Sequence, residues 1–118
     1  MHNFKELKVW QKSMDLAIAI YKVIACLPSE EKYGLVSQMK RCAISISSNI
    51  AEGSGRGSSA QFKYFLSISQ GSAVELETQL ILAKRLELLD DTFATDLIDR
   101  TIEIQKMDCA LERKLTNK

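Results

Sequence analysis

The sequence has 118 residues, a length that predicts one domain with a core of moderate size. Hydrophobic residues make up 46%, and 16 basic against 15 acidic residues leave a net charge of +1, so the overall charge does not indicate a nucleic-acid-binding protein. The N-terminus lacks the apolar segment of a signal peptide, and the longest uncharged run, residues 42–51, is too short to cross a membrane. We therefore expect a cytoplasmic protein that does not interact with membranes.

The first predicted helix runs from about residue 7 to about residue 27. Apolar residues recur at helical spacing, and the stripe expected to face the core is Leu7, Trp10, Met14, Ala17, Tyr21 and Ile24. Other apolar residues, Leu16, Ile18, Ile20 and Val23, widen this stripe until the middle of the helix is apolar on nearly every side. Pro28 ends the helix, because the residue before a proline is disfavoured in the helical conformation.

The second predicted helix runs from about residue 34 to about residue 52. Leu35, Met39, Cys42, Ile46 and Ile50 share one face. The same segment is rich in serine and asparagine, which are poor helix formers that compete for backbone hydrogen bonds. We therefore expect its polar groups to be paired in a structural network made of Gln38, Arg41, Ser45, Asn49, Glu52 and Glu75.

A glycine-rich loop, Gly53 to Gly57, is the clearest break in the chain. Ser58 and Gln61 follow it with the spacing of a capping box, so the glycines are interpreted first as a turn before a capped helix. An alternative is an anion site, because free backbone donors at a helix N-terminus beside Arg56 can hold a phosphate. The loop is no P-loop, since it lacks the Gly-Lys-Ser/Thr ending.

The third and fourth helices are predicted over residues 59–88 and 92–115. Small and polar residues fill the middle of the third helix, from Ser67 to Ala73, and we expect a neighbouring backbone to approach closely there, with the serine-rich part of the second helix as the candidate. Asp90, Asp91 and Thr92 are expected to cap the fourth helix. Because no strand pattern appears and the links are short, the sequence predicts a single all-α domain over residues 1–118, an antiparallel up-down-up-down four-helix bundle.

A bundle of four helices leaves part of the first helix uncovered. A helix that is apolar well beyond one face must bury the remainder against another surface. With no further elements available in the chain, we expect that surface to belong to another copy of the protein, and therefore a homo-oligomer.

Residues capable of catalysis or metal binding are sparse. Three cysteines, Cys26, Cys42 and Cys109, form no paired motif and are expected to be buried reduced thiols. Asp15, Glu52, Glu75 and Glu77 are candidate carboxylates, but a di-metal site in a bundle needs histidines, and the one histidine is His2. We therefore predict no metal, no cofactor and no enzymatic activity. An enzyme with Glu52 and Glu75 as an acid–base pair is the last-ranked alternative.

The runner-up function is sequence-independent binding of RNA or DNA. Residues 1–57 carry eight Lys/Arg and five Asp/Glu, whereas residues 90–118 carry five and seven. A basic rim repeated around an oligomer would contact phosphates, and its candidate residues are Lys8, Lys12, Lys40, Arg41, Arg56 and Lys63. The spacing of Trp10 and Tyr21 favours a core or interface position over stacking on bases.

Several short motifs also match a known family. They are Trp10, Tyr21, Pro28-x-x-Glu31-x-Tyr33-Gly34-Leu35, Gln38-x-x-Arg41, Ser45-Ile46-x-x-Asn49-Ile50-Ala51-Glu52-Gly53, Phe65-Leu66, Gly71-Ser72-Ala73 and Glu75-Leu76-Glu77. Read together, they resemble the four helix bundle protein family, also called the large-subunit ribosomal RNA intervening-sequence protein family. The resemblance covers nearly the whole chain, and residues 38–53 carry its most specific part.

The resemblance implies an antiparallel four-helix bundle that assembles into a ring-like homopentamer, without enzymatic activity. Some members of this family are encoded inside insertions in ribosomal RNA genes. A related branch, the accessory variability determinant of diversity-generating retroelements, is a basic pentamer that binds nucleic acid and acts with a reverse transcriptase. The function expected from sequence is therefore a structural or interaction module. A protein partner other than another copy of the chain is an open alternative.

Overall fold

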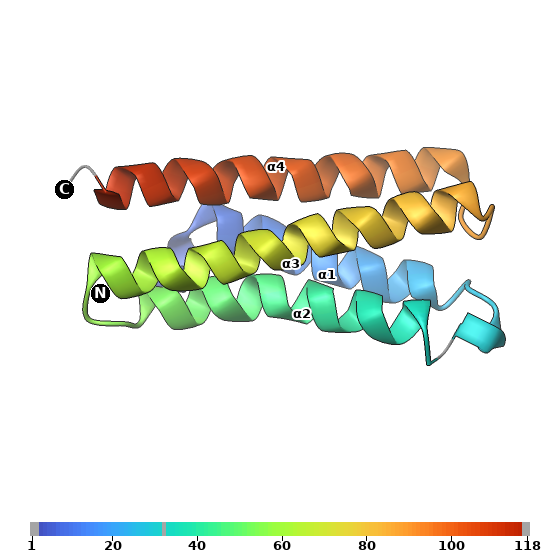
Figure 1. Ribbon diagram of the computed structural model, residues 1–118, viewed down its shortest axis with the longest axis horizontal. Helices are drawn as coiled ribbons and strands as arrows, with labels where there is room; N and C mark the ends of the chain where they lie inside the picture. The colour runs from blue at the N-terminus through green and yellow to red at the C-terminus, as the bar shows by residue number, and fades with distance from the viewer. Residues whose placement is uncertain (1–2, 32, 117–118) are drawn as a thin grey trace.

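The computed structural model describes residues 3–31 and 33–116. In this part of the chain the elements are η1 (Phe4–Glu6), α1 (Lys8–Ile24), η2 (Ser29–Glu31), α2 (Leu35–Ser54), α3 (Ser59–Arg85) and α4 (Asp91–Thr116), and there is no strand. Figure 1 shows the chain passing along each α-helix from one end of the molecule to the other and returning along the next. The molecule measures 46 × 22 × 20 Å. The prediction of an all-helical four-helix bundle is confirmed.

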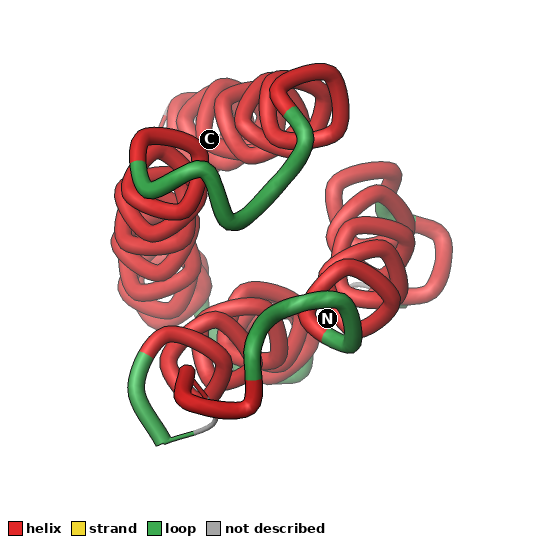
Figure 2. Tube along the Cα trace, turned by 90° about the vertical axis from the view of Figure 1, so that its right-hand side faces the viewer, coloured by secondary structure: helices red, strands yellow, loops and turns green. Residues whose placement is uncertain are grey.

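The four long helices surround a common core. Figure 2 shows their arrangement in a view along the long axis of the bundle. The α3 helix packs against both α2 and α4, and α1 completes the bundle by packing against the other sides of α2 and α4. Fully buried side chains come from every helix, including Leu16, Ile46, Leu76 and Ile104. Each helix therefore contributes one face to a single core.

The starts of α3 and α4 follow local chemistry that the sequence predicted, whereas α1 and α3 end at Ile24 and Arg85, three residues before their predicted ends. The Ser58 hydroxyl accepts a hydrogen bond from the Gln61 backbone N–H at 3.2 Å, which caps the start of α3. At the start of α4, Asp90 Oδ2 accepts from the backbone N–H groups of Thr92 and Phe93 at 3.1 and 3.3 Å. These bonds pair donors that have no partner within the helix.

The predicted core face of the first helix was only partly right, because Ile24 is buried and Leu7, Trp10 and Ala17 pack against the core, but two of its members do not. The buried residues of α1 are Val9, Ser13, Leu16, Ile20 and Ile24, whereas Met14 and Tyr21 from the predicted stripe are exposed. Both sets have helical spacing, because this helix is apolar on more than one side. Spacing alone cannot choose between two apolar faces; the contacts with α2 and α4 decide which one is covered.

Gly53 lies in α2 and not in the glycine-rich loop predicted over residues 53–57. The α2 helix continues to Ser54, and Gly53 is buried in its last turn. A Cβ atom added at Gly53 would lie 2.7 Å from Phe65 Cβ and 3.0 Å from Phe62 Cδ1. The glycine therefore allows α2 and α3 to approach each other closely just before the turn that joins them.

The serine-rich middles of α2 and α3 meet as predicted. The hydroxyls of Ser45 and Ser72 are hydrogen-bonded at 2.8 Å, and Ala73 beside this bond is fully buried. Small side chains and the paired serine hydroxyls bring the two helices together here, while the buried Gln79 Oε1 of α3 is left without a hydrogen-bond partner among the described residues. Among the described residues, no helix is both long and apolar enough to span a bilayer.

The contact at Gly53 makes a prediction about stability. Gly53→Ala should lower the free energy of unfolding by about 1–3 kcal/mol, as overpacking of a tight contact does, despite the better helix propensity of alanine. Chemical denaturation followed by circular dichroism measures the difference.

Gly57→Ala is the matched control. A Cβ atom at Gly57 would meet nothing within 4 Å, and no glycine of the described chain has a positive φ. This control should be neutral or slightly stabilising. Equal effects at Gly53 and Gly57 would contradict the packing argument.

Candidate functional site

Most of the predicted phosphate-binding cations already have partners within the protein. Arg41 donates to Gln38 Oε1 and forms an ion pair with Glu75. The Arg56 guanidinium lies 2.7 Å from Glu52 Oε1, and Lys12 Nζ lies 3.0 Å from Glu103 Oε1. Lys40 Nζ lies 5.4 Å from the centre of the Tyr21 ring, within the range of a cation–π contact. These ion pairs are half-exposed, a setting in which such pairs contribute little stability.

The six cations do not gather at one place. Lys8, Arg56 and Lys63 lie at the end of the bundle where α1 and α3 begin and α2 ends. Lys40 lies fourteen residues before the end of α2, which is about 21 Å along the helix axis. The predicted rim is therefore divided between one end of the bundle and its side.

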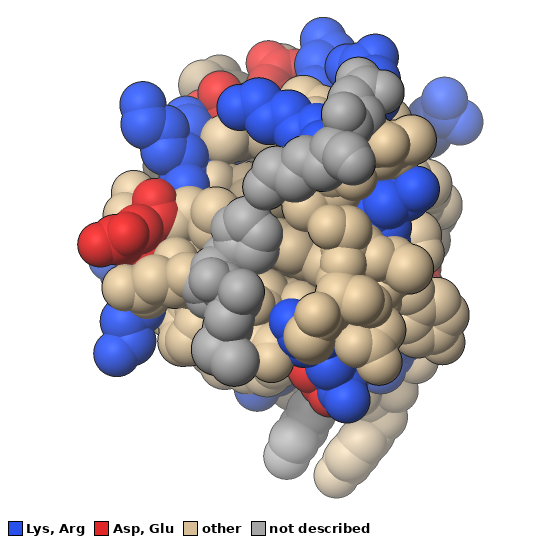
Figure 3. Space-filling view, turned by 90° about the vertical axis from the view of Figure 1, so that its left-hand side faces the viewer, with Lys and Arg blue, Asp and Glu red and all other residues tan. Residues whose placement is uncertain are grey.

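That end of the bundle is nevertheless rich in basic side chains, as Figure 3 shows. The last turn of α4 also ends there and adds Arg113 and Lys114. Sequence reasoning missed these two residues, because they belong to the C-terminal segment whose net charge is negative. The acidic residues of that segment lie mainly in the first turns of α4, at the opposite end of the molecule.

The predicted polar network separates into smaller groups. Arg41 joins Gln38 to Glu75 across α2 and α3. The Asn49 amide donates to Ser45 Oγ at 3.0 Å, and Ser45 in turn bonds Ser72. Glu52 is bound by Arg56 and not by Arg41 or Gln38. The network was expected to hold buried carboxylates, but both Glu52 and Glu75 are exposed.

The glycine-rich turn fits the turn-and-cap interpretation better than the anion site. Ser58 is engaged by Gln61 N–H, while the Gly55 N–H donates to the carbonyls of Ala51 and Glu52 at the end of α2. The Arg56 guanidinium lies 4.9 Å from the centre of the Phe65 ring as well as beside Glu52. The Arg56 guanidinium, the Ser58 hydroxyl and the N–H groups of Gly55 and Gln61 are thus committed within the chain.

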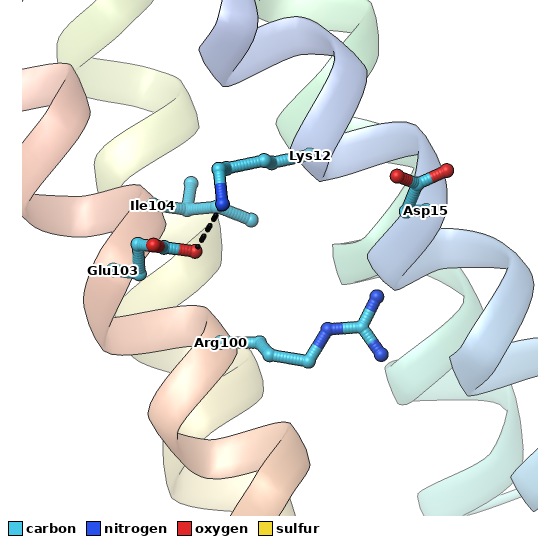
Figure 4. A pocket seen from close by; sticks show the side chains of 5 residues that line it. All are labelled: Lys12, Asp15, Arg100, Glu103 and Ile104. Atoms are coloured by element: carbon cyan, nitrogen blue, oxygen red, sulfur yellow. Dashed lines mark hydrogen bonds and ion pairs between the residues drawn. The ribbon is translucent and has the colours of Figure 1, made fainter.

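A small charged pocket lies between α1 and α4 and is shown in Figure 4. Lys12 and Asp15 face it from α1, and Arg100 and Glu103 face it from α4. Its volume is about 100 Å³, below the size typical of a small-molecule site. Two positive and two negative side chains leave it without a net charge. The pocket is best explained as an electrostatic contact between two helices.

An apolar groove lies on the surface between α1 and α2. Met14, Ile18 and Tyr21 of α1 and Ile44 of α2 are exposed by 37, 51, 43 and 48%. Together with Ala17 and Lys22 they line an open groove of about 480 Å³. We call these four exposed residues the α1/α2 apolar face. It is the excess apolar surface that the composition of the first helix predicted.

The cysteines differ from their predicted burial. Cys26 and Cys109 are exposed, and only Cys42 is buried. Burial raises the pKa of the Cys42 thiol, and the hydrogen bond from Gln79 partly offsets this rise. No cluster of three or more potential metal ligands occurs within residues 3–31 and 33–116. His2, the one histidine of the sequence, lies outside the described residues.

Sequence reasoning missed a carboxylate in the core. Asp108 is fully buried between α4 and α3; its Oδ2 accepts a hydrogen bond from Ser69 Oγ at 3.0 Å, and its Oδ1 has no partner. The sequence does contain a signal for the burial of Asp108. Its spacing places it on the same helical face as four other buried residues of α4, Leu97, Thr101, Ile104 and Leu115. Burial raises the pKa of Asp108 from 3.8 to about 7, with the Ser69 hydrogen bond opposing and the charge of Glu112 adding to the shift.

This buried carboxyl predicts how stability depends on pH. The pKa of Asp108 is raised in the folded state. Above pH 3.8 the unfolded chain therefore releases a proton that the folded protein still holds. Stability should therefore fall as pH rises from about 4 to about 7. Asp108→Asn should remove this fall and raise the free energy of unfolding at pH 8 by about 1–4 kcal/mol. Urea unfolding at pH 5 and pH 8 measures both effects.

Asp99→Asn is the control, because Asp99 is an exposed carboxylate of the same helix. It should leave the pH profile of stability unchanged. An Asp108→Asn protein that is less stable than the wild type at pH 8 would contradict a neutralised buried carboxyl.

Two comparisons place the chain among known proteins. A family model described as 23S rRNA-intervening sequence protein matches residues 5–109. A crystal structure at 1.70 Å resolution, of a protein of unknown function from the S23 ribosomal protein family of Bacteroides thetaiotaomicron VPI-5482, is 28% identical and aligns with a TM-score of 0.82. The alignment covers 89% of this chain and 95% of that one. No curated protein matches the chain.

The family match spans most of the chain and includes the run of residues 38–53 on which the resemblance mainly rested. The similar crystal structure supports the same fold over nearly the same length. The chain therefore belongs to the 23S rRNA-intervening sequence protein family.

Proposed function

We propose that the protein is a non-enzymatic interaction module, an antiparallel up-down-up-down bundle that acts as the building block of a homo-oligomer. The α1/α2 apolar face is the observation that carries this proposal, because four large apolar side chains lie exposed side by side on it. A contiguous exposed apolar patch marks an interaction site. By resemblance to the family, the assembly is a ring-shaped pentamer.

The energetics of the face favour an interaction. Burial of apolar surface is worth about 25 cal/mol per Å², and the exposed fractions of Met14, Ile18, Tyr21 and Ile44 lie between 37 and 51%. Lys22 is the one charged residue that lines the groove, so little desolvation of charge opposes docking. The charged pocket of Figure 4, in contrast, is small and electrically balanced. The surface is thus better suited to holding a partner than to carrying out chemistry.

The proposal places the assembly in the cytoplasm. The three cysteines of the chain form no disulfide with one another, and two of them are exposed. Exposed reduced thiols are typical of a reducing compartment.

Self-association predicts a change of mass in one variant. Wild-type protein should elute as an oligomer at micromolar concentration, and Ile18→Glu should shift it toward the monomer, because a carboxylate would be desolvated in the interface. Size-exclusion chromatography with light scattering measures the mass. Phe93→Glu is the control, since Phe93 is 65% exposed but lies on α4, outside the face. A monomeric wild-type protein would overturn the proposal.

A second candidate function, binding of RNA or DNA, is favoured by the basic end of the bundle in Figure 3. Lys8, Arg56, Lys63, Arg113 and Lys114 lie at this end. Lysine and arginine bind phosphates without regard to sequence. In an oligomer such an end would be repeated once per copy and would multiply weak contacts.

This candidate predicts a steep dependence on salt. A Lys8→Ala/Arg56→Ala/Lys63→Ala variant should lose most of its binding to mixed-length RNA at low salt, measured by fluorescence anisotropy. The wild-type log–log slope should be about −0.7 per phosphate contacted. Lys40→Ala/Arg41→Ala, on the side of the bundle, is the control and should bind as the wild type does. Absence of binding at low salt would rule this candidate out and leave the protein-interaction module.

A further inference from the structure

A second apolar groove lies between the start of α1 and the last turns of α4, at the end of the bundle that Figure 3 shows. Its volume is about 300 Å³, the lower limit of small-molecule sites. We call it the α1/α4 groove. It lies on the α4 side of α1, whereas the α1/α2 apolar face lies on the α2 side. Its apolar lining residues are Leu7, Val9, Met107, Ala110 and Leu111.

The groove is open because the segment before α1 packs elsewhere. The η1 turn contacts α1 and α2, and it makes no contact with α4 among the described elements. Leu7, Met107 and Leu111 pack against the core but remain partly exposed. Ala110 is exposed, and its small side chain leaves room between the larger ones. A chain bound here would therefore contact core side chains that the fold itself leaves uncovered.

The charges that line the groove have one sign. Lys8 and Lys114 line it, both are exposed, and neither side chain has a partner among the described residues. Glu6, Asp108 and Glu112, the carboxylates nearest to these segments in the sequence, are not among its lining residues. Two unpaired cations beside an apolar surface complement a ligand with an anionic head and an apolar chain.

The start of α1 adds to the positive potential at the groove. Leu7, its N-cap residue, provides no side-chain cap, and the first turn of α1 holds no acidic residue. The starts of α3 and α4, in contrast, are capped by Ser58 and Asp90. A helix N-terminus favours a negative charge nearby, so its effect adds to the attraction of the two lysines.

We propose that the α1/α4 groove binds a small single-chain carboxylic acid of the medium-chain fatty acid class. Its apolar chain would lie along α4, and Lys8 and Lys114 would hold its carboxylate. Met107 and Lys114 are seven residues apart, which is about 10 Å along the helix axis. An extended chain advances about 1.2 Å per bond, so roughly eight carbons fill this length. The site is separate from the surface proposed for self-association and does not depend on it.

NMR of the methionine methyl groups measures the binding of octanoate. Octanoate should shift the Met107 signal until the site is saturated and should leave unchanged the signal of Met14, which is exposed in the α1/α2 apolar face. From butanoate through hexanoate to octanoate, the affinity should rise by about two- to fourfold per methylene, because each added group is removed from water. Octanol, which has the same chain without the charge, should bind about tenfold more weakly.

Two variants test the groove itself. Lys8→Ala/Lys114→Ala should weaken the binding of octanoate by about tenfold and leave the binding of octanol unchanged. Lys22→Ala/Lys40→Ala removes the same charge at the α1/α2 apolar face and is the control, with wild-type affinity expected. Ala110→Glu places a carboxylate in the groove and should abolish binding. Because Ala110 is exposed, this variant should keep the helical circular dichroism of the wild type.

Each outcome decides for or against the site. A saturable shift of Met107 that is lost only in the groove variants supports the inference. No shift of Met107, or equal shifts of Met107 and Met14, would overturn it. Octanol binding as tightly as octanoate, or adsorption to phosphatidylserine vesicles without binding of free octanoate, would overturn it as well. A monomeric protein that binds octanoate at Met107 would support this inference and overturn only the proposed self-association.

Discussion

The structure depends on the close approach of α2 and α3. Gly53 lies against Phe62 and Phe65 where the two helices end and begin, and Ser45 and Ser72 are hydrogen-bonded farther along the same interface. Small residues on one helix and paired hydroxyls between the two allow a short separation. The α4 helix packs against the other side of α3, and α1 fills the remaining side against α2 and α4.

The position of α1 in the bundle explains why this helix carries the exposed apolar surface. The α1 helix is the shortest of the four, and its contacts with α2 and α4 are less extensive than those of α3 with its neighbours. It buries one apolar face, but Met14, Ile18 and Tyr21 remain on the other. A bundle that exposes such a face is suited to association, which connects the fold to the proposed function.

The core is not wholly apolar, and its polar residues are specific in position. Asp108 bonds Ser69 across α3 and α4, while Ser13 and Thr101 satisfy their hydroxyls within their own helices. A buried carboxyl with one unpaired oxygen costs stability unless it is neutral. Its raised pKa follows from this cost, and the pairing fixes the relative position of α3 and α4 near one end of the bundle.

The sequence by itself determined the four helices, their caps, the serine contact between α2 and α3, and an apolar excess on the first helix, because these depend on local spacing and on the chemistry of single residues. Only the tertiary structure decided which face of α1 is buried, that Gly53 is a packing contact, and that Arg56 rather than Arg41 binds Glu52. These depend on which surfaces meet between helices. Two apolar faces of one helix have the same periodicity, so only packing against neighbours can distinguish them.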